Sequence, residues 1–97
     1  MYGTVADIRV KPGHQGDLTK LIKEWNTERK PKIPGAVSGY LVQLDSDPQD
    51  MIMIGIFESK GVYQNNANDP EQDAWFRRTM EHLESEPDWH DGQFTEV

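Results

Sequence analysis

The chain has 97 residues, of which 17 are acidic and 10 are basic, giving a net charge of -7, and it contains no cysteine. This length predicts one small domain over residues 1–97, and the missing cysteines exclude disulfides, thiolate metal sites and cysteine nucleophiles. The negative charge disfavours nucleic acid and anionic membranes as partners, and no apolar run approaches the roughly 18 residues of a membrane span. We expect a soluble, cytoplasmic protein without a targeting segment.

The N-terminal third predicts a strand followed by a helix. Successive side chains of residues 2–10 would point to alternate faces of a strand, and this stretch ends at the turn Lys11-Pro12-Gly13. Beyond the turn, apolar residues recur at helical spacing from Leu18 to Trp25, which predicts a helix over Gln15–Arg29. Two prolines and a glycine within residues 30–35 then predict a loop.

The run from Met51 to Phe57 is the longest apolar stretch, and we interpret it as a strand buried on both faces. It follows a second predicted strand, Ala36–Asp45, and turn-forming residues over 46–50. The two strands should form an antiparallel hairpin. Because the run is continuous, the sequence does not say which alternate residues point to which face.

The C-terminal third predicts two helices and a strand. A short helix over Ser59–Gln64 precedes an asparagine-rich stretch. Asp69 is the expected N-cap of the next helix, with Pro70 at its first position and Gln72 three residues after the cap. Pro87 should end this helix, and residues 89–97 predict the last strand.

This order of elements predicts an α+β, ferredoxin-like βαββαβ fold, with a four-stranded antiparallel sheet and helices on one face. The first and third strands would be central, so one side of the apolar run would remain uncovered. An exposed apolar patch of this kind marks an association surface. We therefore predict a face-to-face homodimer. Its predicted interface residues are Met51, Ile52, Met53, Ile54 and Ile56.

The segments Ala6-Asp7-Ile8-Arg9-Val10-Lys11-Pro12-Gly13 and Phe57-Glu58-Ser59, with Pro70 and Trp75, resemble the antibiotic biosynthesis monooxygenase family of dimeric α/β barrels. The resemblance implies the same fold and a range of activities. Members include cofactor-free oxygenases acting on quinols or polyketide aromatics, haem-degrading relatives, and proteins of unassigned activity. The fold alone is therefore a weak guide to chemistry.

The chain departs from this family at several positions. Glu71 stands where many members carry a histidine, four residues before Trp75, and the central strand closes on Phe57 instead of tryptophan. The haem-degrading branch has an asparagine in the first strand, where this chain has Ala6 and Asp7. Haem chemistry is therefore not carried over, and we expect no cofactor.

The three histidines, His14, His82 and His90, form no recognised metal-ligand spacing with one another, so no metal site is predicted. His82 and Glu86 are four residues apart, a spacing that suits a metal pair or an acid-base pair on one helix face. The alternative is that a histidine near a helix C-terminus is simply stabilised by the helix dipole. Asp88, His90 and Asp91 form a second loose cluster, interpreted as a solvated strand entry. Phosphate loops, dinucleotide fingerprints and serine or cysteine nucleophile motifs are absent.

A cofactor-free oxygenase needs an apolar cavity for an electron-rich aromatic substrate and a polar group that handles a proton. The candidate pocket residues are Tyr40, Tyr63, Asn66, Trp75, Phe76, Arg78, Met80 and His82. The alternative is that the aromatic residues are simply core and the polar ones are surface. Two functions therefore stay open: an oxygenase of small aromatics or quinols, and a non-catalytic module that binds a small apolar ligand or assembles. A cavity of about 300 Å³ with a convergent polar group would favour a ligand site.

Overall fold

A computed structural model describes all 97 residues. Its elements are β1 (Tyr2–Arg9), α1 (Gln15–Glu24), β2 (Ala36–Gln43), β3 (Asp50–Phe57), α2 (Lys60–Ala67), α3 (Pro70–Met80) and β4 (Asp88–Gln93). A π-helical turn, Trp25–Arg29, continues α1, and a short 3₁₀ turn follows it. This order matches the predicted one. None of the helices combines the length and the apolar character needed to cross a membrane.

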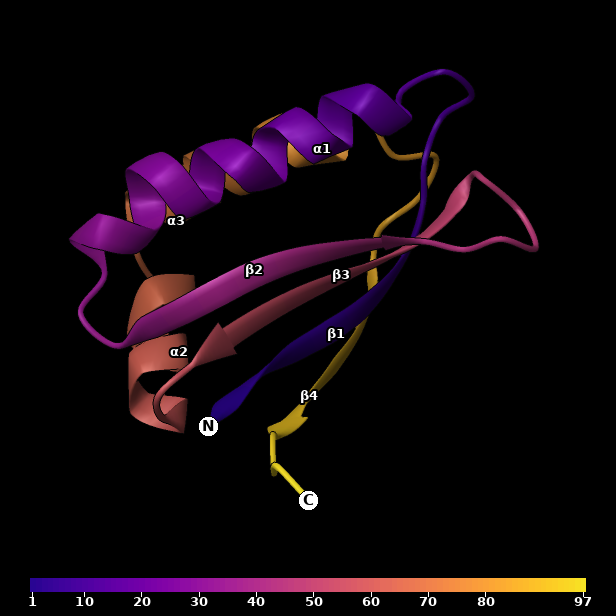
Figure 1. Ribbon diagram of the computed structural model, residues 1–97. Helices are drawn as coiled ribbons and strands as arrows, with labels where there is room; N and C mark the ends of the chain where they lie inside the picture. The colour runs from indigo at the N-terminus through magenta and orange to yellow at the C-terminus, as the bar shows by residue number, and fades with distance from the viewer.

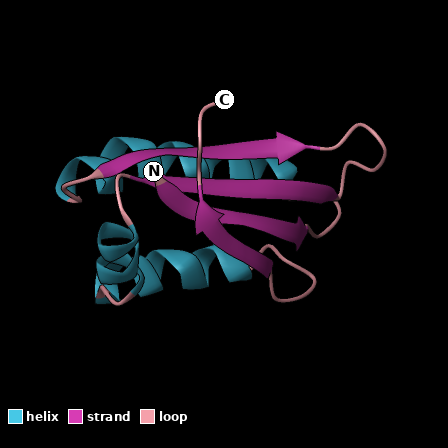
Figure 2. Ribbon diagram, turned by 90° about the horizontal axis from the view of Figure 1, so that it is seen from below, coloured by secondary structure: helices cyan, strands magenta, loops and turns pink.

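The four strands form one antiparallel sheet in the order β2-β3-β1-β4, so β3 and β1 are central, as predicted. In Figure 1, α1 and α3 lie above the sheet and α2 lies beside one end of it. Seen from below, the strands face the viewer and the helices lie behind them (Figure 2). The structure confirms the ferredoxin-like α+β fold with its helices on one face of the sheet.

Strand register assigns each side chain of β3 to one face. Met53 pairs with Ala6 of β1, and both point toward the helices, whereas Ile54 pairs with Val5 on the open face. Met51 and Met53 are 3% and 6% exposed and belong to the core. Their predicted place in an interface is therefore corrected, because α1 and α3 cover them.

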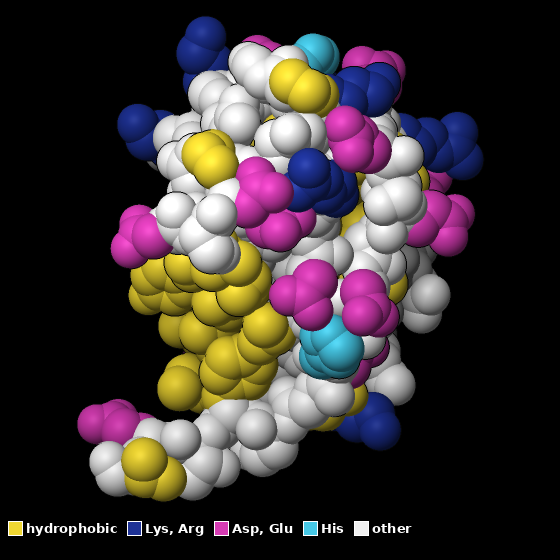
Figure 3. Space-filling view, turned by 90° about the vertical axis from the view of Figure 1, so that its right-hand side faces the viewer, with side chains coloured by type: hydrophobic (Ala, Val, Ile, Leu, Met, Phe, Trp, Pro, Cys, Tyr) yellow, Lys and Arg dark blue, Asp and Glu magenta, His cyan; other side chains and the backbone are white.

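The open face carries the alternate residues of the same strand. Ile52, Ile54 and Ile56 are only partly buried, and Tyr40 and Val42 of β2 pair with Ile54 and Ile52 on the same face. Tyr40 and Val42 are 51% and 40% exposed. Figure 3 shows hydrophobic side chains gathered in a patch on the lower part of the molecule, beside the projecting C-terminal end. We call the five residues named here the open-face patch.

Several element boundaries differ from the predicted ones. α3 ends at Met80, well before Pro87, because Leu83 forms a bridge with Val10 and the Glu84 N–H donates to the Arg9 carbonyl at 2.8 Å. These backbone hydrogen bonds direct residues 83–84 alongside the end of β1, so the helix cannot continue. α2 extends to Ala67 and so includes the first asparagines, and β4 ends at Gln93.

Candidate functional site

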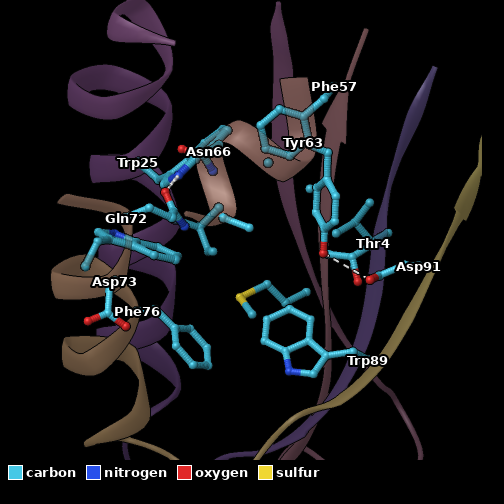
Figure 4. A pocket seen from close by; sticks show the side chains of 17 residues that line it. Thr4, Trp25, Phe57, Tyr63, Asn66, Gln72, Asp73, Phe76, Trp89 and Asp91 are labelled. Carbon is cyan, nitrogen blue, oxygen red and sulfur yellow. Dashed lines mark hydrogen bonds between the residues drawn. The ribbon is translucent and has the colours of Figure 1, made fainter. Parts of the chain in front are cut away.

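A cavity of about 370 Å³ lies between the helix-covered face of the sheet and the helices. This volume falls within the range of about 300 to 1,000 Å³ that is typical of ligand pockets. Most of its wall is apolar and aromatic. The larger apolar side chains that line it are Ile22, Trp25, Met53, Phe57, Tyr63, Trp75, Phe76 and Trp89. Figure 4 shows five of them, Trp25, Phe57, Tyr63, Phe76 and Trp89, around an open central space.

Aromatic rings pack on one another around this space and hold its shape. The Phe57 ring packs edge-on against both Trp25 and Tyr63, with centroids 6.0 and 5.4 Å apart. On another side of the cavity, Phe76 of α3 meets Trp89 of β4 at 5.4 Å. Such tilted and edge-on pairs contribute about 0.5 to 1.5 kcal/mol each beyond the area they bury. The wall is therefore largely pre-formed.

The π-helical turn after α1 positions Trp25 against the sheet. Within this turn, the Asn26 amide exchanges two hydrogen bonds with the Gly39 backbone, at 3.0 and 2.9 Å. A Cβ on Gly39 would lie in van der Waals contact with the Trp25 ring, 3.4 Å away, so the ring packs directly against the β2 backbone. The Trp25 indole N–H donates to Gln72 Oε1 at 3.0 Å. Gln72, predicted as part of a helix cap, is thus engaged with the cavity wall, while Asp69 caps α3 through the Glu71 N–H, as predicted.

On the helix side of the cavity, Arg29 fixes the orientation of Asn66. Both side chains are buried, and the guanidinium donates to Asn66 Oδ1 at 3.0 Å and to Glu71 Oε2 at 2.8 Å. Because a guanidinium can only donate, the carbonyl end of the Asn66 amide must face Arg29. The amide NH₂ has no hydrogen-bond partner within the protein and is available to a molecule in the cavity.

On the sheet side, Tyr63, Asp91 and Thr4 form a second polar group (Figure 4). The Tyr63 hydroxyl donates to Asp91 Oδ1 at 3.0 Å. Burial, and then the hydrogen bond to Asp91 and its negative charge, raise the pKa of Tyr63 to about 12. The Thr4 hydroxyl is buried without a partner, and buried polar atoms of this kind are uncommon unless a water or a ligand satisfies them.

Of the predicted pocket residues, Tyr63, Asn66, Trp75 and Phe76 line the cavity. The other four lie elsewhere. Tyr40 points to the open face, because it pairs with Ile54. Arg78 is on the surface, where its hydrogen bond to Glu24 at 2.9 Å raises the pKa of Arg78.

The remaining two predicted residues are also outside the cavity. Met80 packs on the core, and His82 lies in the turn that follows α3, with Asp17 and His14 as its neighbours. Since α3 ends at Met80, His82 and Glu86 do not share a helix, so the predicted pair is not formed on one.

Sequence reasoning missed several of the lining residues, namely Thr4, Trp25, Gln72, Trp89 and Asp91. Strand alternation contained a signal for three of them, Thr4, Trp89 and Asp91. Trp89 and Asp91 pair with Ala6 and Thr4 on the helix-covered face, so the register of β1 with β4 would have placed them at the site.

No protein-family model matches this sequence, and no curated protein matches it. Solved structures do resemble it. A candidate antibiotic biosynthesis monooxygenase from Caulobacter crescentus CB15 superposes with a TM-score of 0.82 at 15% identity, over 98% of this chain and 90% of the other. A protein of the same description from Bordetella bronchiseptica gives 0.81 at 17% identity, over 97% and 96%.

A conserved protein from Methanosarcina mazei Go1 gives a TM-score of 0.80 at 19% identity, over 97% of this chain and 92% of the other. At these identities the likeness establishes the fold, and the chemistry has to come from the residues themselves. The chain therefore has the fold of the antibiotic biosynthesis monooxygenases, the family that its sequence resembles.

Proposed function

We propose that the cavity binds a small planar aromatic molecule with oxygen substituents at opposite ends, of the hydroquinone class, and that the protein oxygenates it. The observation that carries the proposal is an aromatic cavity of about 370 Å³ with hydrogen-bonding groups on two sides. On the helix side, Asn66 supplies a free amide donor. On the sheet side, Asp91 supplies an acceptor. A ring with a hydroxyl at each end would engage both groups while its faces contact Trp75 and Phe76.

The chemistry needs no external reductant, because the substrate supplies the electrons. One atom of O₂ enters the ring, and the other leaves as water with the two hydrogens that the hydroquinone loses on becoming a hydroxyquinone. The Asp91 carboxylate has lone pairs beyond the one that accepts from Tyr63, so it can accept the substrate proton. With a pKa of about 12, Tyr63 keeps its own proton at neutral pH and acts as a donor.

The open-face patch supports a homodimer as the working form of the protein. Tyr40, Val42, Ile52, Ile54 and Ile56 give β2 and β3 an apolar surface that no helix of the same subunit covers. Contiguous apolar surface at the centre of a sheet is typical of association sites. The same face of a second copy would cover it, which leaves the cavity on the opposite face of each sheet.

The chain carries its own reporter of ligand binding, because all three tryptophans line the cavity. We expect hydroquinones to quench tryptophan fluorescence and to consume O₂ in a one-to-one ratio with product. Trp75→Ala should lower both signals, although its buried ring also supports the fold. An unresponsive fluorescence signal across a panel of hydroquinones, phenols and apolar aromatics would overturn the ligand site itself.

A sharper variant fills the cavity from the sheet. Gly55 faces the cavity, and the nearest atoms to an added Cβ are 3.6 and 4.0 Å away, so Gly55→Val should fold and block binding. Gly92→Val is the matched control, since it adds the same atoms on the opposite face of the sheet, where nothing lies within 4 Å. Equal loss of binding in both variants would count against the assigned cavity.

A non-catalytic binding module is the second candidate, and Glu71 favours it. This residue stands where many family members have a histidine, and its carboxylate is bound to Arg29 at 2.8 Å, away from the cavity wall. The chain thus lacks an imidazole at the site. Fluorescence quenching without O₂ consumption would select this function over oxygenation.

A further inference from the structure

A second group of polar side chains lies at the other end of α1 from the cavity. His14 precedes α1, Asp17 is in its first turn, and His82 comes from the turn after α3. The two imidazole Nδ1 atoms face each other at 2.9 Å, and Asp17 Oδ2 is 3.7 Å from each. Side chains 68 positions apart in sequence thus converge on one point.

We propose that these three side chains bind a divalent transition-metal ion, with Zn²⁺ as the best-fitting species. The point equidistant from three atoms separated by 2.9, 3.7 and 3.7 Å lies about 2.0 Å from each of them. Zn–N and Zn–O bonds in proteins are about 2.0 to 2.2 Å long. An ion at this point would lie in the plane of its three donors, whereas the ligand atoms of a tetrahedral site are about 3.3 Å apart. The imidazoles therefore have to separate, and the carboxylate has to approach, by a few tenths of an ångström (about 0.4 Å) to leave a fourth position for water.

Backbone hydrogen bonds hold the two ligand-bearing segments together. The Lys11 N–H donates to the His82 carbonyl at 2.9 Å, and the His14 N–H donates to the Lys11 carbonyl at 3.0 Å. Next to them, Val10 and Leu83 form a bridge and are both buried. The main chain at His14 and His82 is therefore fixed whether or not an ion is present, which lowers the ordering cost of metal binding.

The electrostatic surroundings also suit a cation. Asp17 and His82 open onto a polar hollow of about 380 Å³, lined by Glu24, Glu28 and Glu81 against Lys20 and Arg78. The dipole at the N-terminus of α1 disfavours a cation, but the carboxylate of Asp17 lies in that turn. His82 follows the C-terminal end of α3, where the helix dipole favours positive charge.

Another histidine cluster provides the comparison. His90 lies 3.0 Å from Asp7 and 3.5 Å from Asp88 on the open face of the sheet, and all three are exposed. This cluster offers a single imidazole, whereas the proposed site offers two, and imidazole nitrogen is a stronger ligand for Zn²⁺ than an exposed carboxylate. The two clusters should therefore differ in affinity, which makes His90 the internal control.

The test is calorimetric titration of the metal-free protein with Zn²⁺, with Co²⁺ as a spectroscopic probe of coordination. We expect one Zn²⁺ per chain, a rise in melting temperature on addition of Zn²⁺, and visible Co²⁺ absorption of a four-coordinate site. Because loss of even an outer-shell partner weakens metal binding by about 10- to 100-fold, His14→Gln and His82→Gln should weaken it at least as much. His90→Gln should leave binding unchanged.

Several outcomes would overturn the proposal. They are no saturable binding by the parent protein, unchanged affinity in both His14→Gln and His82→Gln, or a loss of affinity in His90→Gln equal to theirs. His14 and His82 are partly exposed, so both variants should fold, and their melting temperatures without metal check this. The measurement needs no aromatic ligand, so its outcome is independent of the proposed oxygenase activity.

Discussion

The two faces of the sheet use one apolar strand in opposite ways. On the helix-covered face, Met51 packs into the core, and Met53 and Gly55 line the cavity. On the other face, Ile52 and Ile54 remain partly exposed with no helix over them. Neighbouring residues of similar hydrophobicity thus differ in role because side chains alternate along a strand.

This difference shows that hydrophobicity alone does not define a core. One face of the sheet is completed by the helices of its own chain, and glycines at 39 and 55 leave it partly hollow. The other face carries the open-face patch beside the polar cluster around His90, and no helix of the chain covers it. Cavity and association surface are therefore separated by the thickness of one sheet, and substitutions at adjacent positions should distinguish them.

Met53→Asp should have the largest effect. The substitution places a carboxylate without a partner at a buried position between the core and the apolar cavity, which should cost more than about 4 kcal/mol. A domain of this size is stable by only about 5 to 15 kcal/mol. We expect a largely unfolded chain by circular dichroism. Met53→Leu, which nearly preserves volume, should stay folded, and a folded Met53→Asp protein would refute the assignment of this face.

Ile54→Asp, one residue further on, should change assembly and leave the fold of the chain largely intact. Its carboxylate would point into the proposed interface, where an unpaired charge is costly to desolvate. Sedimentation should show loss of dimer, with monomer or aggregate in its place. The control is Ala74→Asp, which adds the same charge to an exposed position of α3. Retention of a dimer by the Ile54→Asp protein would exclude this face as the interface.

Local patterns in the sequence were sufficient to predict the fold. The helical spacing from Leu18 to Trp25 predicted the helix that the structure contains, with a π-helical turn at its end. The apolar run predicted a central strand. The sequence could not say which of its side chains point to which face, because Met51 through Ile54 are all apolar. Only the register with β1 shows which alternate residues face the helices.

The polar parts of both candidate sites depend on long-range contacts and were harder to predict. Asp91 reaches Tyr63 because β4 pairs with β1, and His82 reaches His14 because Lys11 binds the turn after α3. Neither contact leaves a short-range spacing signal. The sequence left Trp75 and Phe76 open between cavity wall and core, and both line the cavity. Tyr40, chosen on the same grounds, points to the open face, so ring content alone does not assign a face.

Arg29→Met tests whether the helix-covered face is a built site or an ordinary core. The substitution leaves the buried Asn66 carbonyl without its donor, which should cost about 2 kcal/mol of stability in urea denaturation. The Asn66 amide would then be free to rotate, so ligand affinity should fall as well. Glu71→Gln, which alters only the exposed partner of Arg29, should cost about 0.5 kcal/mol and leave affinity unchanged. Equal effects of the two variants would argue for a purely structural role.

Tyr63→Phe should have the smallest effect, about 1 kcal/mol for the hydrogen bond to Asp91, and its signature is the pH dependence. The folded-state pKa of Tyr63 is raised from 10.0 to about 12, so its contribution to stability is fully present below pH 10 and is lost as pH rises toward 12. The parent protein should therefore lose stability relative to Tyr63→Phe over that interval. The difference in their urea midpoints, measured from pH 8 to 11.5, should shrink as pH rises. A constant difference would mean that Tyr63 titrates alike in both states, and that the sheet side of the cavity does not hold its proton.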